Sequence, residues 1–123
     1  MINGLKAVIL ATAIFLCAAA HGEQGAPPQP MACGNGPVER TYGETQWLVF
    51  GCDDRRSVVI VSAPGSPAAP FVFRFLARGD SYVLQSQGTG NRDYTKLAYG
   101  ELRKMGIADI TELVRLTQLL DGN

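Results

Sequence analysis

The spacing of apolar residues changes once along this chain, and this change constrains the fold more than any single motif does. Between residues 45 and 87 the apolar residues fall in short runs with the two-residue period of strands, bounded by turn residues, whereas from Asp93 onward they recur about every 3.6 residues. Strands therefore come first and helices follow, an order typical of α+β proteins. We expect a four-stranded antiparallel meander of two hairpins, followed by two C-terminal helices packed on one face of the sheet.

The strands are predicted from this two-residue period and from the turn residues between them. The four expected strands span residues 45–52, 57–62, 71–76 and 81–87. The first has apolar residues on both faces and is therefore predicted to be central in the sheet. Phe71, Phe73 and Phe75 form a row on one face of the third strand, which lies either under the helices or exposed to a partner.

Capping signals predict where the two helices begin and end. Asp93 stands where an N-cap residue is expected, and Gly106 follows the first helical stripe as a C′ residue. Asp109 is expected to cap the second helix, with Glu112 three residues later in a capping-box relation.

The N-terminus has the features of a secretory signal peptide. Lys6 precedes an apolar stretch over 7–19, and small residues at 18–20 predict cleavage after Ala20 or, as a second choice, after Gly22. No stop-transfer pattern follows, so the mature chain is expected to be soluble, without a transmembrane segment, and periplasmic or secreted. Lipid attachment at Cys17 is the alternative. We expect a flexible leader rich in proline and glycine over 21–38, and a single α+β domain over 39–123.

Charge and cysteine content narrow the classes of partner. Without Lys6 the chain has ten Lys and Arg residues against eleven Asp and Glu residues, which offers no attraction to nucleic acid. Removal of the signal also removes Cys17 and leaves Cys33 and Cys52, an even number that suits an oxidising compartment. We expect these two cysteines to form a disulfide.

The residues needed for most kinds of catalysis are missing from the mature domain. His21 is the only histidine, and it falls in the expected leader, where a general base would have no fixed position. Asp53 and Asp54 share a polar turn, where carboxylates usually face water. One histidine and two bridged cysteines cannot fill a tetrahedral metal site. We therefore expect no enzyme, no metal and no cofactor.

Two segments are predicted to be exposed loops suited to partner recognition. The proline loop, residues 63–70, contains Pro64, Gly65 and Pro67, and cannot form a strand ladder because three prolines lack amide donors. The glycine loop, residues 88–92, consists of Gly88, Thr89, Gly90, Asn91 and Arg92. These loops are the predicted contacts with a protein partner.

Part of the chain resembles the small periplasmic inhibitors of C-type lysozyme. The stretches that carry the resemblance are 50–53 (Phe-Gly-Cys-Asp), 57–61, 71–75, 82–84 and 88–94. The resemblance implies that the loop with Thr89 and Arg92 would occlude the lysozyme cleft without chemistry of its own. This chain departs from that family in three respects: Thr89 replaces a serine, helices follow the sheet, and the second cysteine lies upstream at Cys33.

The first functional prediction is an exported protein that binds another macromolecule, as a periplasmic inhibitor, an immunity-type protein or an accessory subunit. The alternative is a module that binds a small molecule or a cell-wall fragment between sheet and helices. That alternative requires a pocket lined by Trp47, the phenylalanines and Tyr94 or Tyr99.

Overall fold

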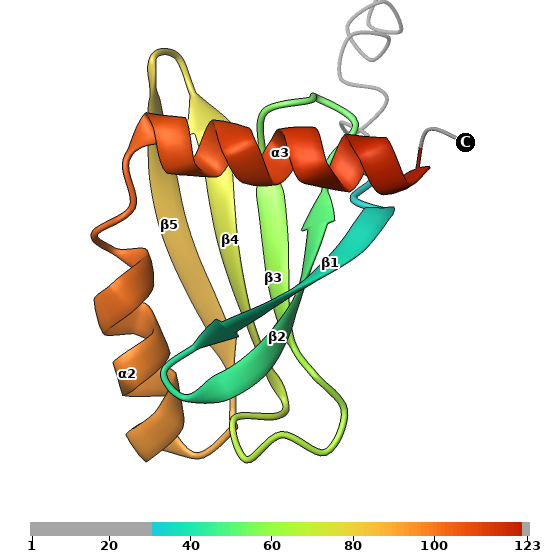
Figure 1. Cartoon of the computed structure of the whole chain (residues 1–123). Coiled ribbons are helices and arrows are strands. Elements are labelled where there is room, and N and C mark those ends of the chain that lie inside the picture. The colour runs from blue at the N-terminus through green and yellow to red at the C-terminus, as the bar shows by residue number, and fades with distance from the viewer. Residues whose placement is uncertain (1–30, 122–123) are drawn as a thin grey trace, which may run out of the picture. The chain divides into compact units, whose positions relative to one another are not determined.

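A five-stranded antiparallel sheet with two helices on one of its faces makes up the part of the chain that the computed structural model describes, residues 31–121 (Figure 1). The strands follow chain order across the sheet, so the sheet is a simple meander. The elements are β1 (Asn35–Tyr42), β2 (Thr45–Gly51), β3 (Val58–Ser62), β4 (Phe71–Arg78), β5 (Ser81–Gly88), α2 (Arg92–Leu102) and α3 (Ile107–Asp121). The α+β class and both predicted hairpins are confirmed.

The prediction of four strands is wrong by one, because β1 was not expected. Its first residues, 35–38, fall in the segment predicted as leader, and the rest of that segment up to residue 30 lies outside the described residues. Val38 is the only residue of β1 that is buried, so the strand shows almost no apolar alternation. Pro37 is compatible with a strand at this position because β1 is an edge strand, and its register with β2 is interrupted between Asn35 and Val38.

The hydrophobic core lies between the inner face of the sheet and the two helices. The strands contribute Trp47, Val49, Val58, Ile60, Phe73 and Phe75, and the helices contribute Ala98, Leu102, Ile110, Leu113 and Val114. The phenylalanine row therefore faces the helices, with Phe71 only half-buried at its end. A Cβ on Gly51 would lie 2.2 Å from Oγ1 of Thr117, so α3 packs directly on the backbone of β2.

Both predicted helix starts are displaced by two or more residues. The N-cap of α2 is Asn91, whose side-chain oxygen accepts a hydrogen bond from the amide of Asp93 at 2.8 Å. Gly106 is not the C′ residue of α2; it directly precedes α3, and the Asp109 carboxylate accepts from its amide at 2.9 Å. Asp109 therefore stands at position N3 and supplies one of the two hydrogen bonds of a capping box, rather than acting as the cap itself. Within residues 31–121, no helix is long and apolar enough to cross a membrane.

The predicted disulfide between Cys33 and Cys52 is confirmed. It joins the chain just before β1 to the residue that follows β2, and Cys52 is completely buried. The amide of Asp53 donates to the carbonyl of Ala32 at 2.8 Å, so a backbone hydrogen bond reinforces the same connection. The edge strand β1 is thus held at its outer end by a covalent bond.

We predict that Cys33→Ala lowers the free energy of unfolding by about 3 kcal/mol, because a closed loop of this size restricts the unfolded chain by about that amount. Thermal unfolding of the oxidised proteins, followed by circular dichroism, should show a melting temperature at least about 10 °C lower for the variant. A reductant should lower the melting temperature of the wild type and leave the variant unchanged. Equal melting temperatures in the absence of reductant would contradict the prediction.

The turn between β2 and β3 is organised by the carboxylate of Asp54. Its two oxygens accept hydrogen bonds from the hydroxyl of Ser57 at 2.6 Å, the amide of Ser57 at 2.8 Å and the amide of Arg56 at 2.9 Å. Partial burial acts to raise the pKa of Asp54, but the hydrogen bonds from Ser57 and Arg56, together with the charge of Arg56, lower this pKa below its ordinary value of 3.8.

We predict that this turn makes folding sensitive to acid. Because the pKa of Asp54 is lower in the folded state than in the unfolded state, its contribution is complete above about pH 4 and is lost as the pH falls through the folded-state pKa. Asp54→Asn should therefore destabilise the protein at pH 7 and have a smaller effect near pH 2, as measured by urea unfolding. Asp53→Asn is the matched control. An Asp54→Asn effect that stays constant with pH would contradict the prediction.

Candidate functional site

The two predicted recognition loops lie side by side and are hydrogen-bonded to each other. The amides of Thr89 and Gly90 both donate to the carbonyl of Pro70 at 3.0 Å, and the amide of Asn91 donates to the carbonyl of Pro67 at 3.2 Å. The proline loop and the glycine loop therefore form one connected surface, although they are far apart in the sequence. The sequence patterns predicted both loops as exposed segments but did not predict the contact between them.

Glycine is required at position 90 for this contact. A Cβ at Gly90 would lie 1.7 Å from the carbonyl oxygen of Ala68, a backbone atom that has no flexible side chain to move aside. Ala68 and Gly90 are both buried, in contrast to the exposed residues that surround them. The glycine loop is thus held against the proline loop by close backbone packing.

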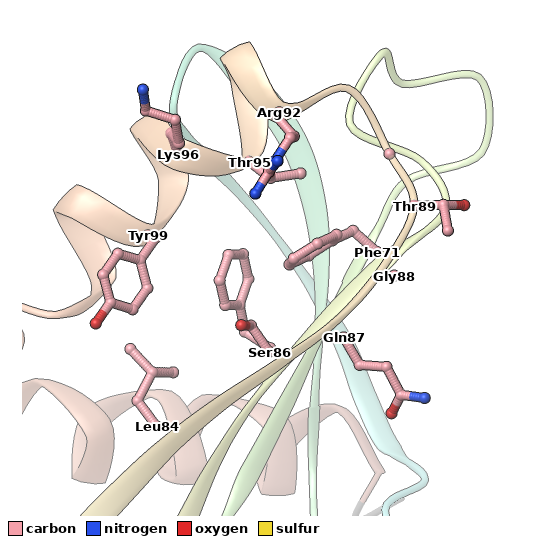
Figure 2. A pocket seen from close by; sticks show the side chains of 12 residues that line it. Phe71, Leu84, Ser86, Gln87, Gly88, Thr89, Arg92, Thr95, Lys96 and Tyr99 are labelled. Atoms are coloured by element: carbon pink, nitrogen blue, oxygen red, sulfur yellow. The ribbon is translucent and has the colours of Figure 1, made fainter.

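An open cavity of about 620 Å³ lies between the inner face of β4 and β5 and the helix α2 (Figure 2). We call it the aromatic groove. Phe71 and Phe73 from β4 and Leu84 from β5 form its floor, Tyr99 from α2 forms a wall, and the glycine loop forms one end. The ring centroids of Phe71 and Phe73 are 5.0 Å apart, and Tyr99 stacks on Phe73 at 6.5 Å. Phe73 itself is buried, so the aromatic surface that the groove presents to solvent comes from Phe71 and Tyr99.

The charge at the rim of the aromatic groove is positive. Arg92 and Lys96 on α2 both line it and are exposed, and the groove has no acidic residue among its described lining residues. In Figure 2 the guanidinium group of Arg92 points into the groove, whereas the amine of Lys96 points away toward the rim. The guanidinium of Arg103 lies 5.9 Å from the centre of the Tyr99 ring and adds a further cation beside the same wall. An anionic group is the favoured occupant of this end of the groove.

The position of α2, and therefore the width of the groove, is set by the turn between β1 and β2. The amide of Gly43 donates to the Glu101 carboxylate at 3.0 Å. A Cβ at Gly43 would lie 2.4 Å from the amide nitrogen of Ala98, and the φ of Gly43 is +58°, so only glycine fits this contact. The helix is held against the turn at its buried side, and its opposite side faces the groove.

The structure brings together some of the predicted site residues and separates others. Gly88, Thr89, Gly90 and Arg92 line the aromatic groove, although the side chain of Thr89 points away from its rings (Figure 2). Asn91 instead serves as the N-cap of α2. Of the predicted site residues, only those of the glycine loop therefore take part in the aromatic groove.

The residues predicted in the proline loop line a second and smaller hollow of about 430 Å³. Pro64, Gly65 and Pro67 face Tyr94 across it. This hollow lacks a charged side chain from α2 and an aromatic floor, so it offers less for recognition than the aromatic groove does. The larger cavity is the better candidate site.

Of the residues predicted to line a pocket between sheet and helices, Trp47, Phe75 and Tyr94 do not line the groove, whereas Lys96 is among the lining residues that were not predicted. Trp47 is completely buried, and its indole NH donates to the carbonyl of Tyr42 at 2.9 Å. The sequence spacing could have identified Lys96 as part of the site, because Arg92, Lys96 and Tyr99 stand at i, i+4 and i+7 and therefore share one face of a helix.

Metal-ligating side chains would make a further kind of candidate site. Residues 31–121 contain no group of three or more His, Cys, Asp or Glu side chains placed to hold a metal ion. The histidine weighed as a general base, His21, lies outside the described residues. Comparison with protein-family models, curated proteins and solved structures finds no match. The function must therefore be inferred from the aromatic groove itself.

We predict opposite effects for two glycine-to-alanine changes near this site. Gly90→Ala should lower the free energy of unfolding by about 2 kcal/mol or more, because the methyl group collides with the Ala68 carbonyl. Gly100→Ala should raise it by about 0.5–1 kcal/mol, because Gly100 lies in α2 with open space around it. Urea unfolding measures both values. If Gly90→Ala were as stable as Gly100→Ala, the described contact between the loops would be wrong.

Proposed function

We propose that this protein is an exported binding protein that holds a macromolecular partner at the aromatic groove. The observation that carries the proposal is the aromatic groove itself, in which half-buried Phe71 and exposed Tyr99 face solvent with cationic side chains at the rim, next to a loop fixed by backbone packing. Aromatic residues and arginine contribute most to binding energy in protein interfaces. The confirmed disulfide supports action in an oxidising compartment, in agreement with the predicted signal peptide.

The rigidity of the site also supports a binding role. The glycine loop makes three hydrogen bonds to the proline loop, and α2 is held by the turn at Gly43. A surface that is already ordered loses little conformational entropy when a partner binds. The partner could therefore be bound without rearrangement of the backbone.

A module that binds a small molecule or a cell-wall fragment is the second candidate function. The volume of the groove, about 620 Å³, falls in the range of small-ligand pockets. Its apolar floor with a few polar groups, among them Ser86 and Thr95, is also typical of such sites. A ligand of this class would carry an anionic group beside a planar or apolar part.

The resemblance to lysozyme inhibitors stays a prediction and would make lysozyme one partner of the proposed class. The loop implied by that resemblance, with Thr89 and Arg92, is the loop that ends the aromatic groove. Inhibition of a C-type lysozyme by the purified protein, measured as cell-wall lysis, tests this form of the proposal directly.

We predict that capture of a macromolecular partner depends on the charge of Arg92. The tagged wild type should retain a stoichiometric partner when purified from its own periplasm, and Arg92→Glu should reduce the amount by at least tenfold, because the groove would present a carboxylate to an anionic partner. Arg78→Glu is the matched control, since Arg78 lies at the opposite end of the β4–β5 hairpin. A partner retained equally by all three proteins, or by none, would overturn the proposal.

A further inference from the structure

The two edges of the sheet differ in how far they are protected against pairing with another strand. The edge strand β1 contains Pro37, Glu39 and Arg40 and has an interrupted register. These are the features by which edge strands avoid further pairing. The other edge strand, β5, runs for eight residues without a charged residue or a proline, and its register with β4 is continuous. Within residues 31–121, β5 pairs with β4 alone.

The hairpin geometry shows which backbone groups of β5 are available. The turn between β4 and β5 has two residues, Gly79 and Asp80, flanked by the pair Arg78 and Ser81. The flanking pair of such a hairpin exchanges both hydrogen bonds, so every second residue from Ser81 directs its N–H and C=O toward β4. The intervening residues of β5, which are Tyr82, Leu84 and Ser86, direct theirs toward the open edge.

The open edge of β5 borders the aromatic groove. Leu84 and Ser86 line the groove with their side chains, and the same two residues direct their backbone groups outward. A strand paired with β5 would lie about 4.8 Å away and would place alternate side chains on the groove side of the sheet. Backbone pairing and filling of the groove can therefore be achieved by one extended segment.

Charge complementarity identifies the chemistry of that segment. Arg92 and Lys96 stand near the Gly88 end of β5, and the described lining of the groove is free of carboxylates. We propose that the partner supplies an extended polypeptide segment that pairs with β5 as a sixth strand. This inference rests on the proposed function. The segment carries a carboxylate, from an acidic side chain or a C-terminus, that binds Arg92 at the Gly88 end, where Lys96 at the rim adds positive charge.

A single strand fits the site better than a second copy of the chain. The helix α2 lies beside β5 at this edge and lines the opposite wall of the groove (Figure 1). One extended strand needs only the strand spacing, whereas a second copy would bring its own helices to the same side. Pairing between two β5 strands would show itself as a dimer.

The test begins with random peptides that have free C-termini, selected on the processed full-length protein. Bound peptides should have alternating apolar residues, and replacing their carboxylates by carboxamides should weaken binding at least tenfold. With a selected peptide, amide hydrogen exchange by NMR should slow at least tenfold at Tyr82, Leu84 and Ser86. Val83 and Gln85, whose amides face β4, serve as internal controls and should change little. N-methylation of alternate peptide amides and the variant Arg92→Glu should each weaken binding at least tenfold, and Arg78→Glu should not.

The results of these binding and hydrogen-exchange experiments distinguish failure of strand pairing from failure of the proposed function. Strand pairing is overturned if no peptide is selected, if the N-methylated peptide binds equally well, or if the three amides gain no protection. It is also overturned if they are protected without peptide in a concentration-dependent dimer. Capture of a partner that depends on Arg92 without protection of these amides would leave the proposed function standing and reject pairing alone.

Discussion

The contact between the β1–β2 turn and α2 is the constraint on which the candidate site depends. Gly43 allows the turn to approach the backbone of α2 to a distance that no other residue permits, and its amide is bound by Glu101. Because the turn holds one side of α2, the face with Arg92, Lys96 and Tyr99 is left toward β4 and β5. A helix without this contact could settle onto the phenylalanine row and close the groove.

The two helices cover different parts of the sheet, and this explains why the groove forms over β4 and β5. α3 packs on β1, β2 and β3, where Gly51 lets it lie directly against the sheet. α2 is held at the far end of the β1–β2 hairpin, so the inner face of β4 and β5 is only partly covered. Phe73 and Phe75 are buried there, whereas Phe71 and Leu84 remain half-exposed. The aromatic surface arises because the helices cover the inner face of β4 and β5 only in part, and not because the core is missing there.

Much of the fold follows from local patterns, and the exceptions have physical causes. The hairpins β2–β3 and β4–β5 were predictable because each strand is a short run of β-branched, aromatic and other apolar residues bounded by turn residues. β1 was not, because an edge strand that buries only Val38 carries almost no periodic signal. The start of α2 was misplaced because Asn91 and Asp93 are both good caps, and only the observed hydrogen bond distinguishes them. The 3.6-residue period locates the helices but not every buried position in them, since Leu97 and Leu120 are 49% and 59% exposed.

The candidate site was predictable only in part, because it is made by tertiary contacts. The glycine loop was recognised from composition, but its attachment to the proline loop depends on Gly90 meeting the backbone of Ala68. Tyr99 meets Phe73 only because Gly43 positions α2. The unprotected edge of β5, in contrast, can be read from the sequence once β5 is known to be an edge. An exposed strand without charge or proline is an aggregation hazard, so its retention beside a cationic groove is best explained by a partner strand that covers it.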